Sequence, residues 1–250
     1  MKLKVLRADP AGNITLFVLS PVEKKDYASV ANRLMALPQF AAEQVGFIHD
    51  GRMDMEAGEF CGNASRAYGM LMARQQGISG EVKIHVSGCD YPLSVVVTED
   101  SAGCEMPLPL WTRKESVKEI DCTLVHLGGI AHLIAENVEP SEAFFSEAEP
   151  IFRKMPELEA YGVIFLDGEH MKPLVKVPAT NTLFWEGSCG SGTLAAQIAR
   201  SEGQPDGVYS GAFIQPAGVV TAEVTRRGGV IVSAKIGGPV TLDEPIEIEI

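Results

Sequence analysis

The sequence predicts an α+β fold built from two similar domains, and three observations carry this prediction. Short strand-like segments outnumber the helical windows, the helices do not alternate regularly with the strands, and one helical motif occurs twice, about half a chain apart. Regular alternation would instead favour a doubly wound parallel sheet. We therefore expect sheets to form most of each domain, with few helices.

The strand-like segments are short runs of aliphatic, β-branched and aromatic residues. Turn residues separate them, for example at residues 9–12, 167–168 and 228–229. They span residues 13–19, 82–86, 93–98, 161–166, 219–225, 230–236 and 246–250.

Two helical windows, residues 62–76 and 190–202, are rich in small and apolar residues on more than one face. Each ends at a glycine that follows a basic residue within a few positions, as helix C-termini often do. Helices of this kind are usually buried, so we expect each to lie inside a curved sheet. A third window, residues 27–35, has a single apolar face.

The two buried helices belong to a longer repeat. Cys61 and Gly62 precede the first helix, and Cys189 and Gly190 precede the second, 128 residues later. Such self-similarity predicts a duplication, with the boundary in the polar, patternless stretch near residues 110–119. The predicted domains are therefore residues 1–115 and residues 116–240, with a cleft at their pseudo-symmetry axis and one cysteine from each domain.

The composition is typical of a globular protein with a small ligand. The chain has 250 residues, 46% of them hydrophobic, and a net charge of -12, which disfavours nucleic acids and anionic membranes as partners. The first residues mix charges with apolar side chains and no apolar run approaches about 20 residues, so we expect a cytoplasmic protein. The five cysteines show no zinc-ligand spacing and are interpreted as reduced thiols without a metal.

Cys61 and Cys189 are the candidate catalytic residues. A thiol at a helix N-terminus meets unpaired amides and the positive end of the helix dipole, so we expect a pKa lowered toward neutrality. Inversion of a stereocentre needs a base on one face and an acid on the other, and two facing thiols supply both. The other cysteines, at positions 89, 104 and 122, lack this context and are interpreted as small buried residues.

Four motifs give the chain a specific resemblance. They are Pro-x-Gly-Asn at residues 10–13, Glu-Gln-Val-Gly-Phe-Ile at 43–48, Glu-Phe-Cys-Gly-Asn-Ala at 59–64, and Trp-Glu-x-Ser-Cys-Gly-Ser-Gly-Thr at 185–193. On these motifs the sequence resembles the diaminopimelate epimerase superfamily over nearly its whole length. It is most similar to the histidine racemase branch, which serves the synthesis of opine metallophores of the staphylopine type.

The resemblance implies two pseudo-symmetric domains of the diaminopimelate epimerase-like fold. Each is a curved, mostly antiparallel sheet or barrel around a central helix, and the final strand, residues 241–250, is expected to return to the first domain. The resemblance also implies an isomerase in which Cys61 and Cys189 act as thiolate and thiol, with no cofactor and no pyridoxal phosphate. The expected partners are a small amino-acid substrate and a second copy of the chain in a homodimer.

The motifs also imply the residues that contact the substrate. Backbone amides of Gly62, Gly190 and Ser191 would bind its carboxylate. The expected substrate-binding residues are Asn13, Glu43, Gln44, Gly62, Asn63, Glu186, Gly190 and Ser191. A plain turn role explains Asn13 equally well.

Glu43 and Glu186 favour histidine as the substrate, because a carboxylate can form a charge-assisted hydrogen bond with imidazole. The Glu-Arg-Gly sequence of diaminopimelate epimerases is missing, since no arginine follows Glu186, and Arg52 stands where those enzymes have asparagine. Diaminopimelate or another amino acid is the alternative substrate. Glu43 is also compatible with a solvated surface position.

Two other functional classes stay open. A cysteine hydrolase would use one thiol with a histidine such as His132 as its base, which leaves the second cysteine unexplained. A binding relative would keep the scaffold without two-base chemistry. His132 itself is as compatible with a structural role as with a functional one.

Overall fold

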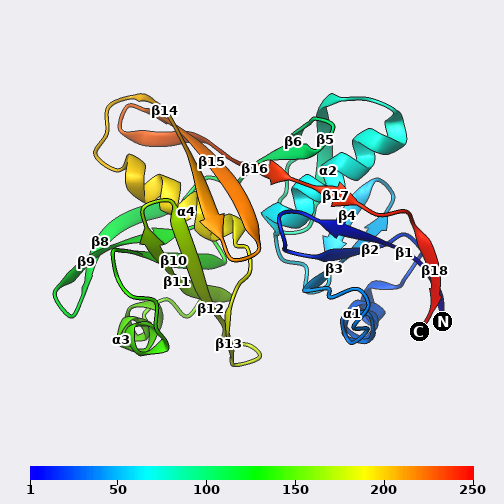
Figure 1. Ribbon diagram of the computed structural model, residues 1–250, viewed down its shortest axis with the longest axis horizontal. Coiled ribbons are helices and arrows are strands. Elements are labelled where there is room, and N and C mark those ends of the chain that lie inside the picture. The colour runs from blue at the N-terminus through cyan, green and yellow to red at the C-terminus, as the bar shows by residue number, and fades with distance from the viewer. The chain divides into compact units, whose positions relative to one another are not determined.

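The computed structural model describes all 250 residues, which divide into two compact units (Figure 1). Unit 1 comprises residues 1–105 and 237–250, and unit 2 comprises residues 106–236. Strands β1 to β18 and only four α-helices make a sheet-rich α+β fold, as the sequence predicted. The division of the chain into domains at residues 115 and 116 stays a prediction.

Unit 1 is a mixed sheet. Strand β1 pairs antiparallel with β2, β17 and β18, so the two ends of the chain share one sheet, and Val5 faces both Val18 and Ile246. Strands β2 and β3 pair parallel, as do β4 and β5, whereas β3–β4, β5–β6 and β6–β7 are antiparallel. The strands are β1 (Lys2–Asp9), β2 (Thr15–Val18), β3 (Gln44–His49), β4 (Arg52–Met55), β5 (Gly80–Val86), β6 (Leu93–Val97), β7 (Ser101–Glu105), β17 (Thr241–Leu242) and β18 (Ile246–Glu249).

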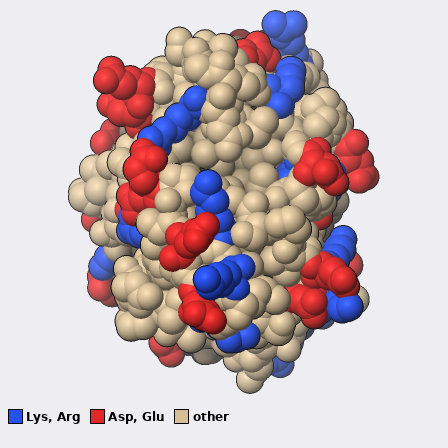
Figure 2. Space-filling view, turned by 90° about the vertical axis from the view of Figure 1, so that its right-hand side faces the viewer, with Lys and Arg blue, Asp and Glu red and all other residues tan.

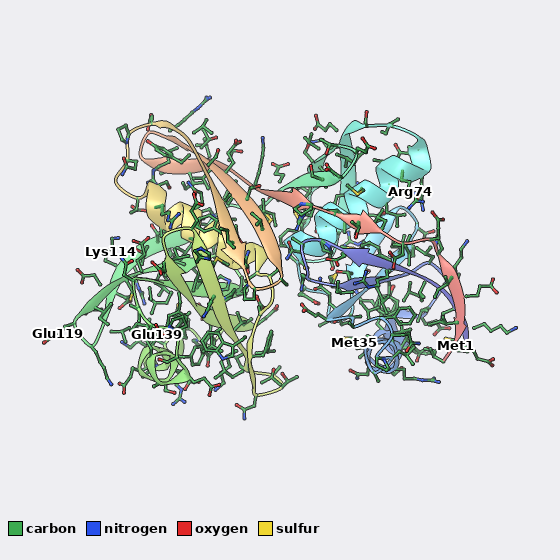
Figure 3. The ribbon with its side chains drawn as sticks, in the orientation of Figure 1. Met1, Met35, Arg74, Lys114, Glu119 and Glu139 are labelled. Carbon is green, nitrogen blue, oxygen red and sulfur yellow. The ribbon has the colours of Figure 1, made fainter.

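Helix α2 (Gly62–Gln76) is buried over most of its length and packs against β5, β6 and β7. Its small residues allow this contact, since a Cβ on Gly69 would lie 2.5 Å from the side chain of Val95 on β6. The helix ends at Gly77, whose φ of 66° gives a left-handed cap. Arg74, labelled in Figure 3, lies in its last turn and pairs with Glu244 of the C-terminal segment.

A second core of unit 1 lies under helix α1. The short 3-10 helix η1 (Lys24–Asp26) leads into α1 (Tyr27–Met35), whose single apolar face is buried, as its pattern indicated. Tyr27 stacks on Phe47 of β3 with ring centroids 3.8 Å apart.

Unit 2 is also a mixed sheet. Strands β8–β9, β9–β10, β11–β12, β12–β13 and β14–β15 are antiparallel, and β10–β11 is parallel. Helix α3 (Glu142–Phe152) packs against β8 and β11. The strands are β8 (Trp111–Val117), β9 (Ile120–His126), β10 (Ile130–Glu136), β11 (Ala160–Asp167), β12 (His170–Val177), β13 (Thr182–Trp185), β14 (Gly207–Gln215), β15 (Gly218–Arg227) and β16 (Val230–Pro239), the last three residues of β16 belonging to unit 1.

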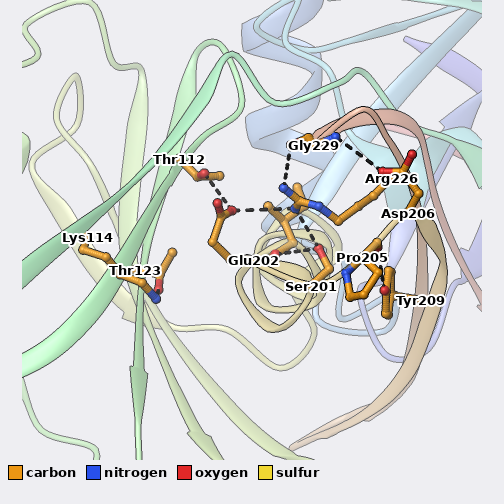
Figure 4. Close-up of polar contacts among 11 residues, drawn as sticks. Thr112, Lys114, Thr123, Ser201, Glu202, Pro205, Asp206, Tyr209, Arg226 and Gly229 are labelled. Atoms are coloured by element: carbon orange, nitrogen blue, oxygen red, sulfur yellow. Dashed lines mark hydrogen bonds and ion pairs between the residues drawn. The ribbon is translucent and has the colours of Figure 1, made fainter.

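Helix α4 (Gly190–Ser201) is the buried helix of unit 2 and contacts β9, β10, β11, β14 and β15. A buried arginine of β15 holds its C-terminal end (Figure 4). Arg226 donates to the Ser201 hydroxyl at 3.3 Å and to the Gly229 carbonyl at 2.8 Å, and its guanidinium lies 3.7 Å from Glu202. Because a cation at a helix C-terminus is favourable, this network fixes the C-terminal end of α4, whereas Cys189 lies at its N-terminal end.

The surface carries both signs of charge. Figure 2 shows acidic and basic side chains interspersed over one face, where neither sign forms a continuous patch. None of the helices combines the length and the hydropathy needed to cross a bilayer.

Candidate active site

Cys61 is the N-cap residue of helix α2. Its extended backbone, with φ -126° and ψ 113°, lets Sγ accept a hydrogen bond from the amide of Ala64 at 3.4 Å. Its carbonyl accepts from the amide and the hydroxyl of Ser65 at 2.9 and 2.7 Å. A sulfur thus takes the place of the oxygen that usually caps a helix, at the positive end of the dipole.

Cys189 repeats this geometry at the start of helix α4. With φ -118° and ψ 107°, its Sγ accepts from the amide of Gly192 at 3.2 Å. Its carbonyl accepts from the amide and the hydroxyl of Thr193 at 3.0 and 2.6 Å. The repeated motif in the sequence therefore gives the same hydrogen-bonded cap in both units.

In unit 1 the turn after β5 holds the residues that lead into Cys61. The Ser87 hydroxyl donates to the Glu59 carbonyl at 2.6 Å and accepts from the amide of Met55 at 2.9 Å. Gly88 has φ +68°, and a Cβ there would lie 2.4 Å from the backbone nitrogen of Phe60. The position therefore needs glycine both for its conformation and for its close approach to the chain.

In unit 2, residues at the end of β14 and just after it hold Cys189 and the segment that leads into it. The Gln215 side-chain oxygen accepts from the Cys189 amide at 2.7 Å, and its nitrogen donates to the Thr193 hydroxyl at 2.9 Å. Two residues on, the amide of Ala217 donates to the Gly187 carbonyl at 2.9 Å. Both cysteines are thus supported by the strand that follows their own helix.

Three of the predicted substrate-binding residues form one network beside Cys61. Asn13 donates to the Glu43 carboxylate at 2.6 Å, and the Gln44 amide nitrogen donates to Asn13 and to the Thr15 hydroxyl, both at 2.8 Å. The Gln44 side chain also forms a hydrogen bond with the Cys61 thiol. Burial raises the pKa of Glu43, and the hydrogen bond from Asn13 opposes that rise.

Asn63 is 2% exposed, and its side-chain oxygen accepts from the buried guanidinium of Arg66 at 3.1 Å. Arg66 also donates to the carbonyls of Gly238 and Pro239 at 2.9 and 3.0 Å, while its second terminal nitrogen has no partner. Burial lowers its pKa to about 10, so the cation persists at neutral pH. Sequence reasoning missed Arg66. Its position among the small and apolar residues of a helix that was expected to be buried was a usable signal.

Beside Cys189, unit 2 places a carboxylate, a hydroxyl and an imidazole. Glu186 forms a side-chain hydrogen bond with the Cys189 thiol. The Ser191 hydroxyl lies 3.5 Å from Cys189 Sγ and 2.8 Å from His132 Nε2. His132 is fully buried, and burial lowers its pKa to about 3, so the imidazole is neutral.

The expectation of lowered cysteine pKa values is wrong. Burial raises the pKa of Cys61 to about 11, against hydrogen bonds from Ala64 and Gln44 that lower it. Burial also raises the pKa of Cys189 well above its usual value, and the negative charge of Glu186 adds to this rise. The helix-cap hydrogen bonds favour the thiolate, but the loss of solvent around each sulfur outweighs them.

Glu56 is a second residue that sequence reasoning missed. Its carboxylate accepts from the amide of Val45, next to Gln44, at 3.0 Å. Burial, followed by repulsion from Glu59, raises the pKa of Glu56 to about 7. Nothing in the sequence distinguishes this glutamate from a surface one, because its burial depends on the pairing of β3 with β4.

The predicted carboxylate-binding groups begin the two helices. Gly62 opens α2, and Gly190 and Ser191 open α4. Amides in a first helical turn have no partner within their helix, so these groups can bind an anion. No group of three or more His, Cys, Asp or Glu side chains converges as a metal site would require.

One known protein family matches almost the whole chain. A family model described as the N-terminal domain of the histidine racemase CntK matches residues 2–243. This chain belongs to the histidine racemase family. Family membership confirms the predicted resemblance and makes the protein an isomerase.

Relatives within the family cover most of the chain. A histidine racemase from Fusobacterium nucleatum is 34% identical over 77% of this chain and 78% of its own length. A histidine racemase from Staphylococcus aureus is 28% identical over 93% of this chain and 92% of its own length.

Solved structures support the fold. A predicted epimerase from Pseudomonas aeruginosa superposes with a TM-score of 0.67 at 11% identity, covering 99% of both chains. A hydroxyproline epimerase from Agrobacterium vitis gives a TM-score of 0.64 at 14% identity, covering 99% of this chain and 92% of the other. At such low identity these likenesses establish a shared sheet-rich architecture alone.

Proposed function

We propose that this racemase family member interconverts L- and D-histidine, with Cys61 and Cys189 as its two bases and without a cofactor. The observation that carries the proposal is the duplicated thiol cap, in which each unit places one cysteine at the start of a buried helix. A duplicated pair is what two-sided proton transfer at Cα requires.

In the proposed reaction the two cysteines lie on opposite faces of the substrate Cα. One sulfur, as thiolate, takes the Cα proton, and the other, as thiol, gives its proton to the opposite face. After one turnover the protonation states of Cys61 and Cys189 are exchanged, so the enzyme is ready for the reverse reaction. The proton count balances, because one S–H bond forms as the other breaks.

The carbanion at Cα needs stabilisation on the substrate carboxylate. Amides of Gly62, Asn63, Gly190 and Ser191 open the two helices and would bind its oxygens, where they also meet the helix dipoles. Exclusion of water from around the substrate would strengthen these interactions. This arrangement is that of the diaminopimelate epimerase-like fold, which we propose for the two units.

The choice of histidine rests on the family and on the carboxylates near the thiols. Glu43 lies in the Asn13–Gln44 network beside Cys61, and Glu186 lies beside Cys189. Either carboxylate can accept a hydrogen bond from an imidazole N–H. The relatives from F. nucleatum and S. aureus carry the name histidine racemase, which supports the same substrate. A homodimer and a cytoplasmic location stay predictions.

Chiral chromatography of the purified, reduced protein tests the substrate. We expect inversion of L- and D-histidine and no inversion of diaminopimelate or of a panel of other amino acids. Inversion of diaminopimelate alone would overturn the substrate while keeping the reaction class. No inversion of any amino acid would overturn the proposed function.

A further inference from the structure

Ser191 lies between the buried imidazole of His132 and the sulfur of Cys189. Its hydroxyl oxygen is 2.8 Å from His132 Nε2 and 3.5 Å from Cys189 Sγ. The other ring nitrogen of His132, Nδ1, is buried and has no hydrogen-bond partner. The three side chains therefore form a chain of contacts that ends on the candidate catalytic sulfur.

The unpartnered Nδ1 decides the direction of these hydrogen bonds. A neutral imidazole carries one N–H, on either Nδ1 or Nε2. A proton on Nδ1 would leave a buried N–H donor without an acceptor, which folded proteins rarely tolerate. We place the proton on Nε2, from where it is donated to the Ser191 oxygen. The Ser191 hydroxyl hydrogen is then directed away from His132 and toward Cys189 Sγ.

We propose that His132 and Ser191 form a hydrogen-bond relay that stabilises the thiolate of Cys189. The inference rests on the proposed function of Cys189 as one of two bases. Ser191 and His132 are positioning residues, because His132 fixes the hydroxyl and the hydroxyl donates to sulfur. No bond is made or broken within the relay.

The groups around Cys189 show what the relay works against. Burial favours the thiol most strongly, and the carboxylate of Glu186 favours it further by its charge and its hydrogen bond. The amide of Gly192 and the hydroxyl of Ser191 favour the thiolate. Because His132 is neutral, it adds no charge to this balance and acts only through the direction of its N–H.

Unit 1 has no copy of this relay. The second residue after Cys61 is Asn63, and its side-chain oxygen accepts from Arg66. The hydrogen bond from a side chain to Cys61 comes from Gln44 instead, which lies on β3. A change in the His132–Ser191 relay should therefore affect Cys189 and leave Cys61 as an internal reference.

Alkylation by iodoacetamide tests the relay without any substrate. The rate at each cysteine is measured by peptide mass spectrometry between pH 8 and 10.5, where it follows the thiolate fraction. We expect Ser191→Ala to lower the rate ratio of Cys189 to Cys61 about tenfold, which corresponds to a rise of one pKa unit at Cys189. Ser191→Thr, which keeps a hydroxyl, should restore the ratio.

A double-mutant comparison tests whether His132 acts through Ser191. His132→Leu should lower the same ratio in the parent protein and have no further effect in the S191A background. An unchanged ratio in S191A would overturn the proposal, and so would an equal effect of H132L in both backgrounds. If H132L fails to fold, the S191A and S191T pair still decides. Failure of histidine racemisation would leave this readout intact, so the two proposals can fail separately.

Discussion

At the start of α2, Cys61 has an amide, Gln44, as its side-chain partner, and the buried cation of Arg66 favours its thiolate. At the start of α4, Cys189 has a carboxylate, Glu186, and a hydroxyl, Ser191. The backbone geometry of the two caps is nearly the same, with φ values of -126° and -118°.

This difference separates what the duplication keeps from what it changes. The sulfur cap, the amide three residues on and the hydroxyl four residues on are present in both units. A glutamate charge raises the pKa of both thiols, Glu59 at Cys61 and Glu186 at Cys189, but the side chains that form hydrogen bonds with the two sulfurs differ. The two thiols are therefore equivalent in position but differ in the side chains that set their acidity, which gives the comparison measurable consequences.

The largest expected effect is the loss of either thiol. Cys61→Ala and Cys189→Ala should each reduce histidine racemisation by about 1,000-fold or more, because one of the two proton-transfer groups is removed. Cys89→Ala in unit 1 and Cys122→Ala in unit 2 are matched controls, since both thiols are buried in a core. Polarimetry measures all four. Full activity after either catalytic substitution would contradict the proposal that both thiols transfer protons.

Gly88→Ala should have the next largest effect, through the backbone before Cys61. We expect it to destabilise the fold by about 3 kcal/mol and to lower kcat about tenfold, because its Cβ would meet the Phe60 nitrogen at 2.4 Å. Gly77→Ala is the control, with a similar φ of +66° and no atom within 4 Å, and should cost about 1 kcal/mol without changing kcat. Urea denaturation and steady-state kinetics check both. Equal effects of the two substitutions would show that the backbone conformation of Gly88, and not its close approach to Phe60, sets the cost.

The raised pKa of Cys61 predicts a pH dependence. Because the thiolate forms only as pH approaches about 11, kcat/KM should rise with pH between 7 and 8.5, by up to about tenfold per unit. Gln44→Met removes the hydrogen bond to sulfur and should lower kcat/KM several-fold across this range. Gln75→Met, at the exposed end of α2, should leave the profile unchanged. A profile that is flat or falls with pH would contradict a thiolate base.

The smallest expected effect concerns the stability of unit 1. The folded-state pKa of Glu56, about 7, lies above its unfolded value, so its stabilising contribution is present at low pH and lost as pH rises through 7. Glu56→Gln keeps an acceptor for the Val45 amide without the charge. Its Tm should match the parent at pH 5 and exceed it by about 5 °C at pH 8. An equal difference in Tm at both pH values would show that ionisation of Glu56 does not cause it.

Local patterns were sufficient to predict the two helix starts and the cysteines that cap them. Glycine and small apolar residues are local signals, and the half-chain repeat and the strand-rich pattern can also be read directly from the sequence. The contacts of Arg66, Glu56 and Gln215 could not be read in this way. Each depends on strand pairing or on chain segments up to 173 residues apart, as for Arg66 and Pro239.

The prediction of lowered pKa values for the two cysteines failed for a related reason. A helix N-terminus is visible in the sequence, and its effect on Cys61 and Cys189 has the expected sign. The burial of the sulfurs is a property of the packed unit, and its larger, opposite effect becomes apparent only in the structure.

Racemisation of L-histidine in deuterated water, followed by proton NMR and chiral separation at early times, tests the two-base claim most directly. With separate thiols on the two faces of Cα, the D-histidine formed should carry deuterium at Cα while the remaining L-histidine keeps its proton. D-histidine that retains the original proton, or exchange of L-histidine without inversion, would mean that one group acts alone and would contradict the account.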